Sequence, residues 1–154
     1  SAASDVYKRQ AISSAMAWAV TTLGVAQALT NFCVAYINNK IVFLLFVNVL
    51  LLLIGMLLDA SPALLLMVPI LWPVAKTLGI DAIHFGVMVC FNLMVGTLTP
   101  PVGMMLFIVS NVGKVKLSVM YKGILPFVAV AVVVLLLITY VPSLTTWLPR
   151  VLMP

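Results

Sequence analysis

Long apolar stretches separated by short polar connections fill most of this chain. Residues 41–58 contain no charged side chain, DASP follows at 59–62, and a second apolar stretch continues to Lys76. Arms of about 13 to 18 residues rise roughly 20 to 27 Å as helices, which is short for a hydrocarbon core about 30 Å thick. The pattern therefore predicts a re-entrant helical hairpin over 41–76. Two ordinary helices whose connection lies in water are the alternative.

The next apolar region, 82–112, contains helix-breaking residues at its centre, in the stretch NLMVGTLTPPVGMMLF. Pro100 and Pro101 have no N–H group and disfavour the α conformation of the residue before them, and Gly103 permits unusual dihedral angles. Backbone freed in this way is costly in lipid unless protein or a wet cavity surrounds it. The sequence thus predicts a transmembrane helix broken at these prolines. A proline kink that neighbouring helices satisfy, without a ligand, is the alternative.

The start of the chain differs in composition from the long apolar stretches that follow it. Residues 1–10 are polar and lack an initiator Met, so we expect a non-native or truncated leader there. Residues 11–23 are apolar but shorter than the roughly 20 residues that a span needs. For 11–40 we expect the end of a transmembrane helix followed, after a bend, by an interfacial arm helix, with a continuation of the span as the alternative.

Two further segments follow the broken helix. Residues 113–122 are basic and amphipathic, which predicts an interfacial connector. Residues 123–149 carry no charge and are long enough to cross a bilayer once, so we expect the final transmembrane helix there. Tyr140 and Trp147 near its end fit an aromatic belt.

The composition agrees with a membrane location. Apolar residues make up 65% of the chain and charged residues 7%, and the mean hydropathy is +1.31. These values exclude a water-soluble domain and predict an all-α polytopic membrane protein. The net charge of +5 is not arranged in basic runs with interleaved aromatics, so we expect no nucleic-acid partner. His84 is the single histidine, and neither a catalytic constellation nor a cysteine metal motif is present, so we expect no enzyme and no cofactor.

Oxygen donors lie at the predicted hairpin tip and at the predicted break. Asp59 is an acidic residue between two long apolar stretches. A carboxylate within a membrane segment is by default a candidate functional residue. Ser61 at the tip and Thr97 and Thr99 at the break add hydroxyls. Freed carbonyls and hydroxyls suit Na⁺, so Asp59, Thr97 and Thr99 are the predicted Na⁺ ligands, and the positive end of a second half-helix from about Met104 suits an anionic substrate. If the tip lies in water, Asp59 is only a helix cap.

Three other polar residues lie in predicted helices. Asn48 and Asn92 either belong to the site or bond one helix to another. We expect a structural role for His84, near the membrane interface and exposed, in preference to a proton relay.

Two motifs resemble the C-terminal part of the large permease subunit of TRAP transporters, the tripartite ATP-independent periplasmic carriers. The first is G-M-x-x-D-x-x-P, formed by Gly55, Met56, Asp59 and Pro62. The second is N-L-x-x-G-x-x-T-P-P-V-G, formed by Asn92, Leu93, Gly96, Thr99, Pro100, Pro101, Val102 and Gly103. The resemblance covers residues 12–154.

The resemblance implies an ion-transporter fold of the elevator type, with two inverted repeats, of which this chain is the second. The tip at 55–62 would face the unwound loop at 96–103, with a Na⁺ site between them. The substrate- and ion-binding residues implied are Gly55, Asp59, Ser61, Pro62, Asn92, Gly96, Thr97, Thr99, Pro100, Pro101 and Gly103.

The resemblance also implies a function in the bacterial inner membrane. The permease would import organic acids such as C4-dicarboxylates, sialic acid or other sugar acids, with Na⁺ as the coupling ion. Its partners would be a small TRAP membrane subunit, a periplasmic substrate-binding protein, the missing N-terminal half of the same subunit and the lipid bilayer. Two alternatives remain open: an anion/Na⁺ symporter that needs no binding protein, and a non-transporting membrane assembly module.

Overall fold

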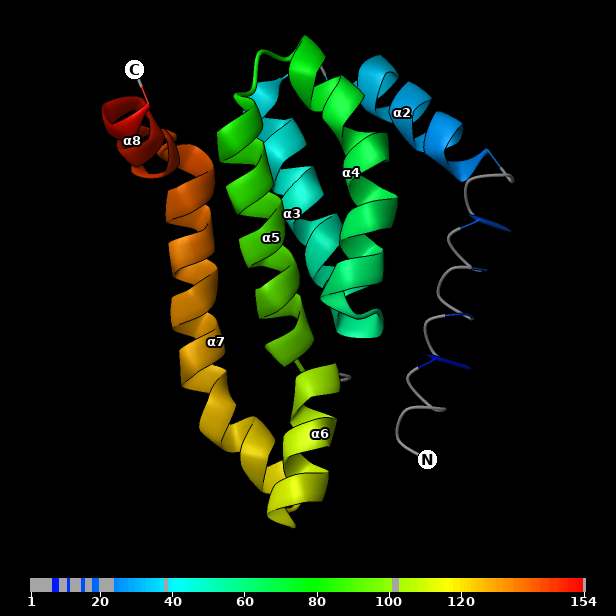
Figure 1. Ribbon diagram of the computed structural model, residues 1–154, viewed down its shortest axis with the longest axis vertical. Helices are drawn as coiled ribbons and strands as arrows, with labels where there is room; N and C mark the ends of the chain where they lie inside the picture. The colour runs from blue at the N-terminus through cyan, green and yellow to red at the C-terminus, as the bar shows by residue number, and fades with distance from the viewer. Residues whose placement is uncertain are drawn as a thin grey trace.

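The computed structural model describes residues 7–8, 11, 15, 18–19, 24–37, 39–100 and 103–153. The described residues are helical or lie in short connections, which confirms the all-α prediction. The helices are α2 (Val25–Tyr36), α3 (Lys40–Leu57), α4 (Ala60–Thr77), α5 (Ala82–Leu98), α6 (Met104–Gly113), α7 (Leu117–Tyr140) and α8 (Ser143–Leu152) (Figure 1). Most of the predicted leader at 1–10 lies outside the described residues, as does Pro101.

Among the described residues, α3, α4 and α7 are each long and apolar enough to cross a membrane, and α5 is a shorter apolar helix. The chain is therefore a multi-pass membrane protein, as its composition predicted. Since α3 and α4 have 18 residues each, their length is compatible with full spans as well as with a re-entrant hairpin. The re-entrant arrangement stays a prediction.

The α3–α4 hairpin follows from capping residues at both helix starts. The side chain of Asn39 accepts a hydrogen bond from Ile41 N at 3.0 Å, and that of Asp59 accepts one from Ala60 N at 2.8 Å. Such caps satisfy N–H groups that a helix leaves unpaired in its first turn. Pro62 sits in the first turn of α4, where a missing N–H costs little. The two helices lie side by side with their connection at one end of the bundle (Figure 1).

Helix α5 is the centre of the described structure. It packs against α3, α4 and α7. Its residues Phe85, Met88 and Leu93 are fully buried against core residues that include Leu51 of α3 and Leu71 of α4. These large apolar side chains fill the space between helices as a packed interior requires.

Two glycines let α3 and α5 approach each other closely at one end of this core. A Cβ added to Gly96 would lie 2.9 Å from the Cα of Gly55, and a Cβ added to Gly55 would lie 3.0 Å from the carbonyl oxygen of Leu93. Real Cβ atoms essentially never show the contact at Gly96, and the contact at Gly55 is tighter than most real Cβ contacts. Small residues that bring helix backbones together are typical of packing in membranes, where lipid provides no hydrophobic driving force.

The end of the chain differs from its prediction. A single helix was expected over 123–149, after a connector at 113–122. In the structure α7 already begins at Leu117, ends at Tyr140 and is followed by the separate helix α8. Pro142 explains the interruption, because it lacks an N–H and keeps Val141, with φ −118° and ψ 82°, out of the helical region.

The glycine crossing is testable by substitution. We expect Gly96→Ala to destabilise the protein by about 1–3 kcal/mol, because the new methyl group forces α3 and α5 apart. Gly86→Ala on the same helix is the matched control, since a Cβ there meets nothing within 4 Å, and alanine is the better helix former. Thermal unfolding in detergent measures both variants. Equal melting temperatures for the two would contradict the importance of the crossing.

Candidate functional site

The glycine crossing places the hairpin tip and the interruption between α5 and α6 at the same end of the bundle. Gly55 lies one turn before Asp59 of the tip, and Gly96 lies about one turn before Thr99, where α5 has ended. The tip and the interruption therefore lie close to one another (Figure 1). These are the two segments that carry the predicted site residues.

At the interruption, α5 ends at Leu98 and Thr99 adopts an extended conformation, with φ −84° and ψ 127°. The hydroxyl of Thr97 donates to Met94 O and that of Thr99 to Val95 O, both at 2.7 Å. Because each hydroxyl proton is used in a bond to its own helix, the oxygen lone pairs are left as acceptors. Thr97 is only 2% exposed. Both hydroxyls thus use their protons within α5 and keep lone pairs that can accept a hydrogen bond or bind a cation.

Gly103 holds the start of α6 close to the end of α5. Its φ of 43° lies in the left-handed region, which glycine adopts at low cost. A Cβ at this position would meet Leu106 Cδ1 at 3.0 Å and the carbonyl oxygen of Thr99 at 3.2 Å. Pro100 lies in a turn before it. The N-terminal end of α6, the positive end of its dipole, therefore lies close to the end of α5.

The hairpin tip is less enclosed. Asp59 and Ser61 are exposed and Pro62 is half-buried. One carboxylate oxygen of Asp59 caps α4, which is the structural role that the sequence left open. Within the described ranges no hydrogen bond joins these tip side chains to Thr97 or Thr99. The structure thus brings the two segments together through Gly55 and Gly96, and not through their oxygen donors.

Asn92 faces α3 within the core. Its Nδ2 donates to Asn48 Oδ1 at 2.8 Å and to Asn48 O at 3.1 Å. Asn48 Nδ2 in turn donates to Thr139 Oγ1 of α7 at 2.9 Å, and that hydroxyl donates to Leu135 O. The two asparagines therefore join helices, as one of the two interpretations expected. Asn92 Oδ1 is buried and has no partner among the described residues.

His84 continues this set of bonds. Its Nε2 lies 3.1 Å from Thr139 O, and its Nδ1 lies 2.9 Å from Thr145 Oγ1 of α8. A carbonyl oxygen only accepts, so Nε2 carries the proton in that bond. The ring is 1% exposed, so the expected exposed position was wrong, and the bonds give His84 the structural role that was expected.

Together these groups form a polar chain, defined as Asn92, Asn48, Thr139, His84 and Thr145. It connects α5 with α3, α7 and α8. Sequence reasoning named three of its members separately and missed both threonines. A usable signal was the spacing of His84 and Asn92, which lie about two turns apart and so share one face of α5.

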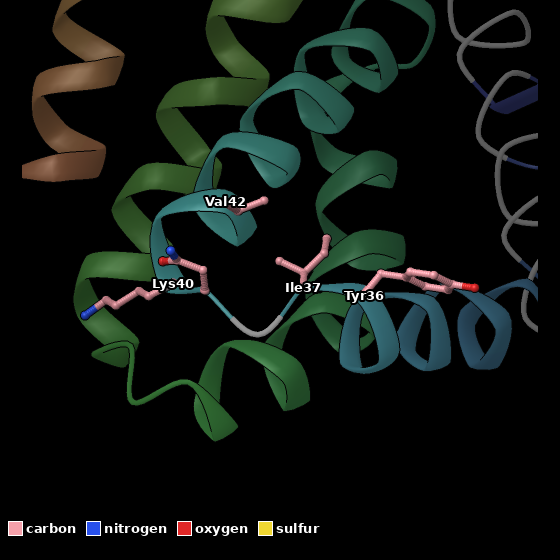
Figure 2. A pocket seen from close by; sticks show the side chains of 5 residues that line it. Tyr36, Ile37, Lys40 and Val42 are labelled. Carbon is pink, nitrogen blue, oxygen red and sulfur yellow. The ribbon is translucent and has the colours of Figure 1, made fainter.

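A separate open hollow of ≈ 470 Å³ lies at the junction of α2 and α3. Its lining residues are Tyr36, Ile37, Asn39, Lys40 and Val42. Figure 2 shows the side chains of Tyr36 and Lys40 extending away from each other. None of the predicted site residues lines this hollow, and its polar groups do not converge on a common point.

Acidic and thiolate metal ligands are not gathered anywhere in the part of the chain that the structure describes. No group of three or more His, Cys, Asp or Glu side chains occurs there.

The sequence of the chain matches a known family. The family model of the tripartite ATP-independent periplasmic transporter, DctM component, matches residues 5–144. The chain belongs to this TRAP large permease family. Both sequence motifs lie within the matched residues, so the resemblance seen in the sequence is confirmed.

Individual relatives support the assignment. The sialic acid TRAP transporter large permease protein SiaM of Vibrio cholerae is 41% identical over 133 residues, which cover 86% of this chain and 31% of the relative. The C4-dicarboxylate TRAP transporter large permease protein DctM of the same organism is 43% identical over 115 residues, covering 75% and 25%. The isethionate TRAP transporter permease protein DctMQ of Oleidesulfovibrio alaskensis is 43% identical over 107 residues, covering 70% and 17%. The chain thus spans a third or less of the length of these TRAP permeases.

The polar chain makes a stability prediction. Thr139→Val keeps the shape of the side chain but leaves Asn48 Nδ2 without its acceptor, so we expect a loss of about 1 kcal/mol. Thr77→Val is the control, because the Thr77 hydroxyl bonds only to Val74 O of its own helix and the residue is exposed. Thermal unfolding in detergent compares the two variants. If Thr139→Val melts no lower than Thr77→Val, the polar chain contributes nothing to stability.

Proposed function

We propose that this chain forms the part of a Na⁺-coupled permease that binds a sodium ion and an organic acid between the hairpin tip and the α5–α6 interruption. The observation that carries the proposal is the Gly55–Gly96 contact, which holds these two segments together. Membership of the TRAP large permease family supports the transport function.

The sodium site is proposed at Thr97 and Thr99. Both hydroxyls donate their protons to α5 carbonyls, so the lone pairs of both oxygens are left for a cation that enters the site. The backbone carbonyls of the non-helical segment at Thr99 and Pro100 add further oxygen donors, an arrangement typical of discontinuous helices in secondary transporters. Asp59 contributes its free carboxylate oxygen when the tip closes on this segment.

The substrate is proposed to be an organic anion. Relatives are named for sialic acid, C4-dicarboxylate and isethionate, and these compounds are all anionic at neutral pH. The N-terminal end of α6 directs unpaired N–H groups and a positive dipole end toward the interruption, which favours a carboxylate or sulfonate there. A bound sodium ion beside it adds a further positive charge.

The rest of the transporter is proposed from the membership of this chain in the TRAP large permease family. The α3–α4 hairpin re-enters the membrane, and the chain works as one of two inverted repeats of an elevator-type carrier in the bacterial inner membrane. The rest of the permease, a small membrane subunit and a periplasmic binding protein complete the system.

The hydroxyl of Thr99 provides the first test. In proteoliposomes with the complete permease, its small subunit and its binding protein, we expect Thr99→Val to raise the half-saturating Na⁺ concentration about tenfold, the effect of losing roughly 1.4 kcal/mol of ligand binding. Thr77→Val, remote from the interruption, should leave it unchanged. Substrate uptake measured as a function of Na⁺ concentration gives the half-saturating concentration for each variant. Uptake that is independent of Na⁺ in the unmodified protein would exclude the proposed coupling.

The charge of Asp59 provides the second test. Asp59→Asn keeps a side chain that caps α4 as well as aspartate does, so we expect an unchanged melting temperature. The same substitution removes the negative charge that would face the cation. We therefore expect uptake to need a higher half-saturating Na⁺ concentration. Asp59→Ala removes the cap as well, and should lower both stability and Na⁺ affinity. An unchanged half-saturating Na⁺ concentration in Asp59→Asn would mean that Asp59 acts only as a helix cap.

A further inference from the structure

Helix α8 presents an apolar stripe away from the rest of the described structure. The stripe is defined as Leu144, Trp147, Leu148 and Val151, which follow one another at the i, i+3, i+4 and i+7 positions of one helix face. Each of these four side chains is more than half exposed. Such a stripe on a single helix requires a covering phase or partner.

The opposite face of α8 is fixed to the protein. Thr146 is 4% exposed and Thr145 lies against His84, whose Nδ1 is 2.9 Å from the threonine hydroxyl. The Thr146 hydroxyl donates to Pro142 O at the start of the same helix, at 2.9 Å. The bond to His84 and the burial of Thr146 orient the helix, so turning the apolar stripe inward would break that bond and expose Thr146.

The position of α8 places it at a membrane boundary. It begins directly after α7, which is long and apolar enough to cross a bilayer. Figure 1 shows α8 folded over the end of α7 and not extending it. A short helix that turns at the end of a span, with one apolar face, is oriented along the interface.

The side chains at the edge of the stripe fit that position. Trp147 belongs to the stripe, and tryptophan favours the level of the lipid headgroups. Ser143 and Arg150, about two turns apart, form a polar edge next to it. Arg150 is exposed and α8 has no acidic residue. The edge therefore carries the charge that complements anionic headgroups.

We infer that α8 is a membrane-interface helix whose apolar stripe is covered by lipid, at the boundary of headgroups and acyl chains, and whose Arg150 contacts lipid phosphate. The occupant of the stripe is the bilayer, because α8 directly follows a helix that is long and apolar enough to cross a membrane and the stripe is bordered by a cationic edge. Through the bond between Thr145 and His84, this lipid contact also anchors the first turn of α5.

Quenching of Trp147 fluorescence by brominated lipid tests the inference. Trp18→Phe and Trp72→Phe leave Trp147 as the single tryptophan of this segment, and any tryptophan elsewhere in the complete permease is replaced in the same way. In liposomes, we expect lipid brominated close to the headgroup to reduce the emission of Trp147 more than lipid brominated near the chain end. The matched control keeps Trp72 as the single tryptophan. Trp72 is half-buried and lies 5.8 Å from the ring of Phe85, so weaker quenching is expected.

Arg150 gives the second readout. We expect anionic lipid to increase the quenching of Trp147 relative to zwitterionic lipid, and we expect Arg150→Gln to abolish this increase. Absence of quenching by either brominated lipid would overturn the inference, because water or protein then covers the stripe. Quenching mainly by bromine near the chain end would make α8 a continuation of the span. Quenching that disappears when the small membrane subunit is added would make that subunit the occupant.

Discussion

The contact between Gly55 and Gly96 is the constraint on which the rest of the site depends. Helices with ordinary side chains pack about 8–10 Å apart, and a methyl group at either glycine would meet backbone atoms of the other helix. Without this approach, the end of α3 and the end of α5 would separate, and the tip after α3 would lose its position beside the interruption after α5. A backbone contact is a suitable way to fix such a site, because it leaves the polar side chains free for a ligand.

The polar chain also holds α3 and α5 together, through hydrogen bonds. Asn48 and Asn92 bond α3 to α5, and Thr139 and His84 extend the bonds to α7. In lipid, apolar side chains give little net preference for helix contact over lipid contact, so close packing and buried hydrogen bonds contribute most of the specificity. Helix α5 is thus held by hydrogen bonds from its first turn to Asn92 and by backbone contact at Gly96, near its end.

Sequence patterns predicted the helical class, the membrane location and the family because these depend on local composition and on order along the chain. Pro100 and Gly103 likewise marked the interruption through their own backbone chemistry. The polar chain was not predictable in the same way, because Thr139 and Thr145 reach His84 only through the packing of α7 and α8 against α5. Helix α8 was missed since an uncharged stretch was counted as one span, although Pro142 within it carried the contrary signal.

The difference between the hydrogen-bonded part of α5 and its end bears on the proposed binding segment. Irregular backbone at membrane depth is tolerated only where protein surrounds it or where it lines a water-filled cavity. His84 and Asn92 bond to other helices, while the hydrogen bonds of the Thr97 and Thr99 side chains among the described residues go to carbonyls of α5. Helix α5 is regular as far as Leu98, and the irregular backbone begins at Thr99. Its local geometry is held by the α3 contact at Gly96 and by the turn at Gly103, and both depend on the absence of a side chain.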